Sequence, residues 1–389
     1  MLLFFIVWTW FIITIYYMKI VQILETFNPY EWQVSSYAWE FAKNFVSEKY
    51  WGVVNLVLFA PEDDDRKWYD LDWYRVIYLP TVKIGSHRFL KFWSKEYWNC
   101  INRVKTWNPD TIHTHSRSFL VSMFWLIYSI LWNKKWIFFE HSAWRRTVLW
   151  WWKSLRRKVY NRSIWKISLI FCNNIIVLNQ LSYNYLKKFT TKRLNLIYRW
   201  CDIPIAKKVN RNDFVIRMCF ISDIVKSSGI GTLFKAYVEI IKTHPNVMLD
   251  IIWDGDEKLE LERLIVAFGI SNWMRVLWKI SKDEIWQKYL PTYDIVINPT
   301  LDNEELISET TLWWLLAKCL VISTDIWAVR EITNMEDLII VPINDVNAMI
   351  GAIEHALWRL EKSWMSYDIV KEKFSWKNAL KQYMQVCYP

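Results

Sequence analysis

The feature of this chain that most restricts its fold is a regular alternation of short apolar runs and longer amphipathic stretches, which begins at Met18. Short apolar runs bounded by polar turns predict buried strands, and the amphipathic stretches between them predict helices. Strands that alternate with helices over short loops are typical of a doubly wound parallel sheet. We therefore expect an α/β fold with strands at 18–24, 55–60, 76–79, 111–115, 136–140, 175–178, 194–198, 217–222, 248–253, 275–277, 295–298, 320–323 and 338–341. The expected helices lie at 94–106, 118–131, 147–170, 231–243, 257–268, 281–289, 310–318, 346–360 and 376–386.

A polar break at residues 206–213 interrupts this pattern, which then restarts. Such a break is typical of a linker. The sequence therefore predicts two Rossmann-like domains, at residues 18–205 and 214–370, followed by a terminal helix within residues 371–389.

Charge is divided at the same place. Residues 1–205 hold 28 Lys and Arg against 14 Asp and Glu, whereas residues 206–389 hold 21 against 25. The basic first domain is expected to face something anionic. Charge alone leaves a phospholipid surface, a polyanionic acceptor and nucleic acid open.

Residues 1–17 are apolar and uncharged. They fall short of the roughly 20 residues of a membrane helix, and they lack the basic region and cleavage site of a signal peptide. We expect translation to start at Met18, with a membrane anchor or an uncleaved signal as the alternatives. The six cysteines show neither a C-x-x-C pair nor zinc-ligand spacing, which predicts a reducing, cytoplasmic location.

Glycine is scarce and tryptophan abundant. The chain holds 7 Gly and 29 Trp, although an ordinary glycine usage of about 7% would give about 27 glycines. An indole cannot serve where the backbone needs a positive φ or a close approach. We hypothesise that many of these tryptophans are glycines in the living protein because its UGA codons are read as glycine. A protein that is truly rich in tryptophan is the alternative.

Ligands of open α/β sheets bind at the carboxyl ends of the strands, so the loops after the strands are the candidate sites. No P-loop motif is present. The segment Gly229-Ile230-Gly231-Thr232 follows one strand and opens a helix, which places amide N–H groups and the positive end of a helix dipole near Lys226. It is either a seat for a diphosphate or a plain tight turn.

Three histidines follow or end strands of the first half. His113 and His115 are two residues apart and share one face of their strand. Since no carboxylate or Cys lies at ligand spacing, we expect no metal site. His141 either touches a sugar hydroxyl or carries a proton, or it is a buried structural residue.

Two further charged groups have open interpretations. Asp302, Glu304 and Glu305 follow the strand at 295–298, where carboxylates can hold sugar hydroxyls; a solvated loop is the alternative. Basic residues interleaved with Trp and Leu fit a surface helix that binds anionic lipid, or they form a merely solvated face. They are Arg145, Arg146, Lys153, Arg156, Arg157, Lys158, Arg162 and Lys166.

The order of these loops resembles glycosyltransferase family 4 (group 1), from Met18 to about Met384. Residues 27–34 resemble the family's glycine-rich acceptor loop, 109–115 its PDIIHTH strand, 197–202 its IPNGVD, 252–255 its IGDG and 323–331 its ATDVGGVRE. Five tryptophans stand where the family has glycine, which supports the recoding hypothesis: Trp32, Trp200, Trp253, Trp278 and Trp327.

The resemblance implies the GT-B fold, in which two Rossmann-like domains face a cleft and the C-terminal helix packs back on the N-terminal domain. It implies an enzyme that moves a sugar from a nucleotide-diphosphate donor with retention of configuration and usually without a metal. Such an enzyme needs no cofactor, and its partners are the donor and a glycan or lipid-linked acceptor. We expect it in the cytoplasm at the inner membrane face, in cell-surface glycan synthesis, with no nucleic acid partner.

The same resemblance assigns roles to residues. His141 and Glu305 are the expected catalytic residues, and Glu305 matches the first carboxylate of the family's E-x7-E motif. The expected donor-binding residues are Lys226, Gly229, Glu304 and Glu309, and the acceptor loop is represented by Trp32, Gln33 and His115.

Three positions depart from the family. Asp223 and Ser228 stand where the family has its phosphate-binding Arg and Lys, and Trp313 stands at the second carboxylate of E-x7-E. A catalytically impaired paralogue that binds sugar nucleotides or acts as a scaffold is therefore the main alternative. A nucleotide-sugar epimerase of related architecture is a third.

Overall fold

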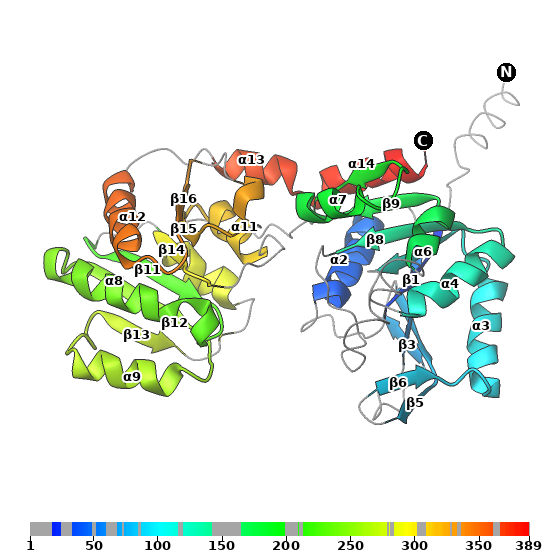
Figure 1. Cartoon of the computed structure of the whole chain (residues 1–389), viewed down its shortest axis with the longest axis horizontal. Coiled ribbons are helices and arrows are strands. Elements are labelled where there is room, and N and C mark those ends of the chain that lie inside the picture. Colours follow the sequence, from blue (N-terminus) through cyan, green and yellow to red (C-terminus); the bar gives the residue numbers. More distant parts are fainter. Residues whose placement is uncertain are drawn as a thin grey trace, which may run out of the picture. The chain divides into compact units, whose positions relative to one another are not determined.

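The computed structural model forms two compact units, Met1–Tyr198 with Ala379–Pro389, and Arg199–Asn378 (Figure 1). We call them the N-terminal and the C-terminal unit. The structure describes residues 18–24, 33–48, 52–59, 68–71, 74–84, 87–115, 120–141, 165–198, 209, 213–277, 280, 284–301, 309–326, 329–332, 336–360 and 366–388.

The N-terminal unit is built on an eight-stranded sheet of order β10-β9-β8-β7-β1-β2-β4-β3. All its strand pairs are parallel except β3–β4 at one edge, and β5 and β6 form a separate antiparallel pair. The strands are β1 (Met18–Ile23), β2 (Gly52–Phe59), β3 (Trp68–Leu71), β4 (Tyr74–Leu79), β5 (Thr81–Ile84), β6 (His87–Leu90), β7 (Thr111–His115), β8 (Lys135–Glu140), β9 (Asn174–Val177) and β10 (Leu194–Leu196).

The helices of this unit are α2 (Gln33–Ser47), α3 (Lys95–Trp107), α4 (Leu120–Leu131), α6 (Trp165–Phe171), α7 (Gln180–Leu186) and α14 (Trp376–Cys387). The start of α3 is set by Ser94, whose hydroxyl accepts the N–H of Tyr97, and its end by Asn108 in the left-handed conformation. Gln33, expected in the acceptor loop, is instead the first residue of α2. The strands β3, β5 and β6 and the helices α2 and α7 were not expected from the apolar pattern.

The C-terminal helix α14 packs on the N-terminal unit, as the resemblance implied. The Tyr383 hydroxyl lies 2.8 Å from His113 Nε2, and Tyr388 bonds to Thr111. The Lys135 ammonium bonds to the Cys387 carbonyl and lies 4.5 Å from the centre of the Tyr388 ring. These contacts join the last residues of the chain to β7 and β8.

The C-terminal unit contains a six-stranded, fully parallel sheet of order β13-β12-β11-β14-β15-β16. Its strands are β11 (Ile216–Ile221), β12 (Val247–Ile252), β13 (Met274–Leu277), β14 (Ile295–Asn298), β15 (Leu320–Thr324) and β16 (Leu338–Val341). Its helices are α8 (Ile230–Thr243), α9 (Lys258–Ala267), α11 (Glu309–Leu316), α12 (Val346–Arg359) and α13 (Ser366–Lys373). Both parallel sheets confirm the predicted fold class.

One predicted helix differs in kind. Residues 281–289 were expected to form an α-helix, but Ile285–Tyr289 is a π-helical turn that runs into a 3-10 turn at Leu290–Thr292. Pro291 has no N–H to donate to a helical ladder, so the regular helix cannot continue through it.

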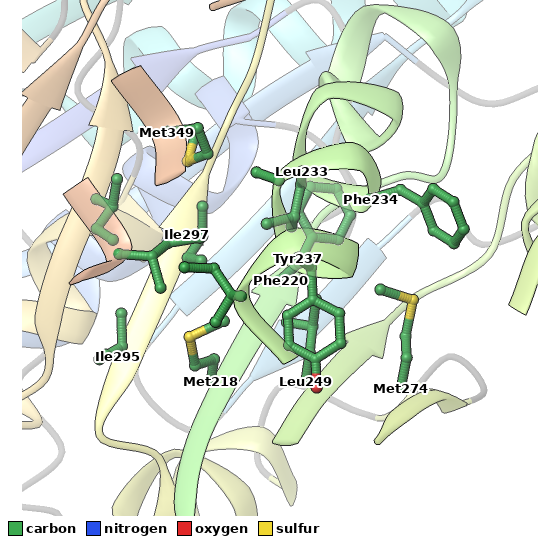
Figure 2. Close-up of a cluster of buried hydrophobic side chains, with 14 of the residues drawn as sticks. Met218, Phe220, Leu233, Phe234, Tyr237, Leu249, Met274, Ile295, Ile297 and Met349 are labelled. Atoms are coloured by element: carbon green, nitrogen blue, oxygen red, sulfur yellow. The ribbon is translucent and has the colours of Figure 1, made fainter. Parts of the chain in front are cut away.

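The core of the C-terminal unit fills the space between the sheet and two neighbouring helices. Figure 2 shows Phe220 of β11 and Leu249 of β12 below Leu233 and Tyr237 of α8, with Met349 of α12 beside them. All five side chains are fully buried. The polar end of one of them is satisfied, since the Tyr237 hydroxyl lies 2.9 Å from the Val247 carbonyl. The apolar runs of the sequence are therefore strands buried on both faces.

Trp253 has a backbone conformation that ordinary side chains avoid. It follows β12 with φ of +134°, whereas the other non-glycine residues of positive φ among the described ones have φ between 50° and 58°. In the same turn, a Cβ added at Gly255 would lie 2.4 Å from the Ile224 carbonyl oxygen. The turn after β12 is thus one that glycine suits at two positions.

We expect Trp253→Gly to raise the free energy of unfolding by about 1–3 kcal/mol, because glycine removes the strain of a side chain at this φ. Trp253→Ala should give little of this gain, since alanine keeps the Cβ. Trp98→Gly, at a half-exposed position within α3, is the matched control and should lower stability by about 0.5–1 kcal/mol. Urea unfolding measures all three, and equal stabilities of the Trp253→Gly and Trp253→Ala proteins would contradict strain at this position.

Candidate functional site

The strand order of the C-terminal unit reverses at β11, which lies between β12 and β14. The chain leaves β11 toward β12 and leaves β14 toward β15. In doubly wound sheets such a reversal separates the two following loops, and ligands bind outside the carboxyl ends of the strands there. The loops after β11 and β14 are therefore the candidate ligand-binding loops of this unit.

The loop after β11 ends in the turn that the sequence singled out. Lys226–Ser228 form one 3-10 turn, and Gly229 follows with φ of +76° as the N-cap of α8. Gly229 has no side chain with which to cap this helix start. Lys226 is exposed. The arrangement combines a cation with the positive end of a 14-residue helix, which suits an anionic ligand.

The loops after β11, β14 and β15 are held together by close contacts. A Cβ added at Gly229 would lie 1.8 Å from the Pro299 carbonyl oxygen, so only glycine fits here. The Leu301 N–H donates to the Ser227 carbonyl over 2.8 Å. The Thr324 hydroxyl donates to the Thr300 carbonyl over 2.7 Å. The three strand ends therefore form one rigid platform.

The expected sugar-binding carboxylates follow this platform directly in the sequence. Glu304 and Glu305 lie outside the described residues, which stop at Leu301 and resume at Glu309. Glu309 is the first residue of α11, and its side chain lies outside the described part. Their roles remain predictions.

The three residues that depart from the family pattern lie in different surroundings. Asp223 is exposed in the same loop as Lys226. Ser228 is 5% exposed, and its hydroxyl donates to the Val225 carbonyl over 2.7 Å, a local bond within the turn. Trp313 is half-buried on α11. Lys226 is thus the basic side chain that the described part of this loop offers to an anion.

A second cluster lies within the N-terminal unit. His115, at the end of β7, and His141, directly after β8, are hydrogen-bonded between Nδ1 and Nε2 over 3.0 Å. The His115 Nε2 lies 3.1 Å from Oε1 of Gln22 on β1. The Tyr37 ring of α2 stands edge-on to His141 with the ring centres 4.9 Å apart. Gln22, Tyr37 and His115 are 0–2% exposed and His141 is 4% exposed.

Burial keeps the rings of His113 and His115 neutral. Burial lowers the pKa of His115 to about 3. Burial, with a smaller contribution from His115, holds the pKa of His113 well below its usual value. His113 and His115 are both buried, but His113 bonds to Tyr383 of α14 and is part of the helix docking. The sequence therefore identified two members of the cluster, His115 and His141, but did not predict that they contact each other.

Gln22 and Tyr37 were missed. The sequence did carry a signal for Gln22, which is a polar residue inside the apolar strand 18–24. A buried polar side chain within a strand requires a partner. Nothing in the local pattern distinguishes Tyr37.

Other predicted sites lie outside the described residues. Trp32 and nearly all of the basic segment 145–166 are among them, as are Trp200, Trp278 and Trp327. Within the described ranges, no group of three or more His, Cys, Asp and Glu side chains could hold a metal ion. In that same part of the chain, no helix is both long and apolar enough to span a bilayer.

Comparisons with known proteins cover both units. Residues 34–203 match the family described as Glycosyltransferase Family 4, and residues 216–358 match Glycosyl transferases group 1. A Methanocaldococcus jannaschii protein described as an uncharacterized glycosyltransferase is 20% identical over 89% of this chain and 92% of its own length. The alpha-monoglucosyldiacylglycerol synthase of Acholeplasma laidlawii is 32% identical over 23% of this chain and 22% of its own.

Solved structures share the fold of the whole chain. A glycosyltransferase from Rickettsia africae superposes with a TM-score of 0.72 at 16% identity, covering 95% of this chain and 98% of that one. Anabaena HepE in complex with UDP superposes with a TM-score of 0.69 at 13% identity, covering 95% and 99%. At these identities the likeness concerns the fold.

We expect Gly229→Ala to lower the free energy of unfolding by about 1–3 kcal/mol or more, because its Cβ would collide with the Pro299 carbonyl at a positive φ. Gly231→Ala is the matched control: this glycine lies in the first turn of α8 with no atom within 4 Å of the added Cβ, so alanine should stabilise by about 0.5–1 kcal/mol. Urea unfolding of both variants tests the platform. A Gly229→Ala protein as stable as the parent would show that the three loops can separate without cost.

Proposed function

We propose that this chain, which belongs to glycosyltransferase family 4 (group 1), is a retaining, metal-independent enzyme that moves a sugar from a nucleotide-diphosphate donor to a glycan or lipid-linked acceptor. The observation that carries the proposal is the platform at the carboxyl ends of β11, β14 and β15. There Lys226 and the uncapped start of α8 offer positive charge to a diphosphate.

The relatives support a nucleotide sugar as donor and a cell-surface glycan as product. Anabaena HepE has been solved with UDP, with UDP and glucose, and with UDP-glucose. The S. aureus TarM G117R mutant was solved with UDP and alpha-GlcNAc-glycerol, and WaaB is described as a lipopolysaccharide outer core galactosyltransferase. We propose the same classes of donor and product for this chain.

The roles of individual residues follow from charge and position. Lys226 and the turn at Gly229 hold the diphosphate, and Glu304, Glu305 and Glu309 surround the transferred sugar. A carboxylate beside a sugar hydroxyl accepts a charge-assisted hydrogen bond, which orients the ring. No metal or cofactor is needed in this scheme, because the cation and the helix dipole meet the charge of the leaving diphosphate.

In the N-terminal unit, which is proposed to bind the acceptor, we assign His141 to the site of the reacting sugar. Its neighbour His115 and the residues Trp32 and Gln33 belong to the acceptor region. His141 accepts a hydrogen bond or a proton from a sugar hydroxyl there.

One observation favours the second candidate, a catalytically impaired paralogue that binds sugar nucleotides or acts as a scaffold. Asp223 and Lys226 share one loop and are both exposed. Lys226 therefore attracts an anionic ligand, and Asp223 repels it. Ser228 is closed into the turn. A single cation therefore replaces the pair of cations that the family pattern contains.

We also propose that UGA is read as glycine in the gene of this protein. The φ of +134° at Trp253 supports this interpretation, as does the low glycine content. The gene provides the test. UGA at codon 253 supports the proposal, and UGG there contradicts it.

Calorimetric titration with UDP-, GDP- and ADP-sugars tests the donor site. Lys226→Ala should weaken binding by roughly 1.5–3 kcal/mol, the scale of a hydrogen bond to a charged group. Lys235→Ala, an exposed lysine farther along α8, is the control and should bind as the parent does. Glu305→Gln should reduce turnover and leave nucleotide binding nearly unchanged, because its carboxylate touches the sugar and not the phosphates.

The outcomes separate the two candidates. Binding with donor hydrolysis or transfer supports the enzyme. Binding without either supports the impaired paralogue. If the folded protein binds none of these donors, the enzyme and the sugar-nucleotide-binding paralogue are both contradicted, and the scaffold remains.

We further propose that the N-terminal unit lies against an anionic membrane at the cytoplasmic face. The helices α4 and α6 contact each other, and both carry exposed apolar side chains. These are Ile127, Ile130, Leu131, Ile170 and Phe171, which are 53–71% exposed. The basic segment 145–166 runs directly into α6. A membrane-binding surface combines apolar side chains, which insert into the bilayer, with cations, which attract anionic lipid headgroups.

Reversing Arg156 and Arg157 to glutamate should weaken binding to vesicles of anionic lipid by tenfold or more, since each cation near such a surface contributes about 1 kcal/mol. Ile130→Ser with Leu131→Ser should also weaken it. Leu259→Ser with Val266→Ser, equally exposed on α9 of the C-terminal unit, is the matched control and should change nothing. Co-sedimentation measures the affinity. Unchanged binding of the first two variants would contradict the membrane-binding surface and would leave Arg156 and Arg157 as charges that serve solubility.

A further inference from the structure

Three neighbouring strands of the N-terminal unit each supply one side chain to a continuous buried hydrogen-bond chain. Gln22 comes from β1, His115 from the end of β7 and His141 from the residue after β8. β7 pairs with β1 on one side and with β8 on the other. We call Gln22, His115 and His141 the histidine relay.

The direction of the relay begins with the amide of Gln22. Its Nε2 donates to the Ala38 carbonyl over 2.9 Å. A carbonyl only accepts, so the amide nitrogen must face Ala38, and Oε1 faces His115. The amide oxygen also only accepts. The proton in the bond between Gln22 and His115, 3.1 Å long, therefore belongs to Nε2 of His115.

His115 carries a single ring proton. It is fully buried, it stacks on Phe139 with the ring centres 5.1 Å apart, and burial lowers its pKa to about 3. With the proton on Nε2, its Nδ1 holds a lone pair. The 3.0 Å bond to His141 then requires His141 Nε2 to be the donor. The relay thus runs from His141 to His115 to Gln22 to Ala38.

We propose that Gln22 and His115 are positioning residues that fix the proton of His141 on Nε2, so that Nδ1 is the atom with which His141 accepts a hydrogen bond or a proton from the substrate. The proposal rests on the proposed function in one respect, which is the place of His141 at the reacting sugar. Without the relay, a neutral histidine would divide between two tautomers, and one of them would present an N–H to the sugar hydroxyl.

The main chain of His141 is fixed as well. Its carbonyl accepts a hydrogen bond from Asn179 Nδ2 over 3.2 Å, and the Oδ1 of Asn179 accepts the Ser182 N–H at the start of α7 over 2.6 Å. The edge of the Tyr37 ring contacts the His141 ring from α2. Ring position and tautomer are therefore set by separate contacts, which is what an oriented acceptor requires.

His113 is a buried histidine that does not belong to the relay. It lies on the same face of the same strand and is equally buried. Its Nε2 bonds to the Tyr383 hydroxyl, 2.8 Å away on the C-terminal helix. It therefore provides a matched control for the loss of a buried histidine that leaves the relay intact.

The test is nitrogen-15 NMR of the histidine side chains in the full chain, where six histidines must be assigned. In the parent protein we expect one tautomer at neutral pH for both relay histidines, with the proton on Nε2 and the lone pair on Nδ1. In Gln22→Met, which removes the acceptor but keeps much of the volume, we expect the His141 signals to move toward a mixture of tautomers, although the bond that is lost is the one to His115. In His113→Phe they should stay where they are.

The second readout is turnover with the donor that the calorimetric panel identifies. Gln22→Met should lower kcat by about tenfold, the scale of one neutral hydrogen bond, with donor affinity unchanged. A mixture of tautomers at His141 in the parent protein, or the same tautomer in the parent and in Gln22→Met, would overturn the relay. A fixed tautomer in a protein that turns over no donor would support the relay and contradict the proposed function. The parent spectrum decides the proposal even if Gln22→Met does not fold.

Discussion

Both units depend on one constraint, which is that a polar side chain inside a sheet covered on both faces must be paired. In the C-terminal unit, Asp250 on β12 is 5% exposed and accepts two hydrogen bonds from Arg275 and one from Tyr293, each 2.8–2.9 Å long. Arg275 is the register partner of Asp250 on β13, and Tyr293 lies two residues before β14. An unpaired carboxylate at this depth would cost several kcal/mol, so the residues around it have a structural role.

In the N-terminal unit, the pairing of two buried polar side chains has a different result. Gln22 and His115 satisfy each other, and the chain of bonds continues to His141 at the end of β8. The two clusters differ in where they stop. Asp250 is paired with Arg275 on the neighbouring strand β13 and with Tyr293 just before β14, whereas the relay leads from Gln22 near the carboxyl end of β1 to a residue beyond the end of β8. Strand ends are where doubly wound sheets bind ligands, so pairing inside the sheet serves orientation at its edge.

The sequence predicted the strands well because their burial is encoded locally. Residues 111–115, 295–298 and 338–341 were predicted with the bounds that β7, β14 and β16 have. Residues 94–106 were predicted as a helix, and α3 begins one residue later because Ser94 is its N-cap. The edge strands β3, β5 and β6 were missed because they contain charged and aromatic residues without a clear period, and their pairing depends on neighbours distant in sequence.

The candidate site was predicted in its parts and not in its contacts. The turn at Gly229 follows from its glycines and its place after a strand, but its approach to Pro299 requires the strand order, which no local pattern contains. His115 and His141 stood out as histidines at strand ends. Their bond depends on the parallel register of β7 and β8, in which His115 pairs with Phe139, two residues before His141. Gln22 became meaningful only when β1 was placed beside β7.

Glycine links these observations to the chemistry of the site. At Gly229 and Gly255 a side chain would strike the Pro299 and Ile224 carbonyls, so the loops after β11, β12 and β14 can approach each other only through glycine. Trp253 lies in the same group of turns with a φ that glycine adopts freely. A platform that receives a diphosphate needs its backbone amides exposed and its loops close together, and bulky side chains oppose both. Trp253, the position where tryptophan is least expected on physical grounds, is therefore one where the proposed donor site has much to gain from glycine.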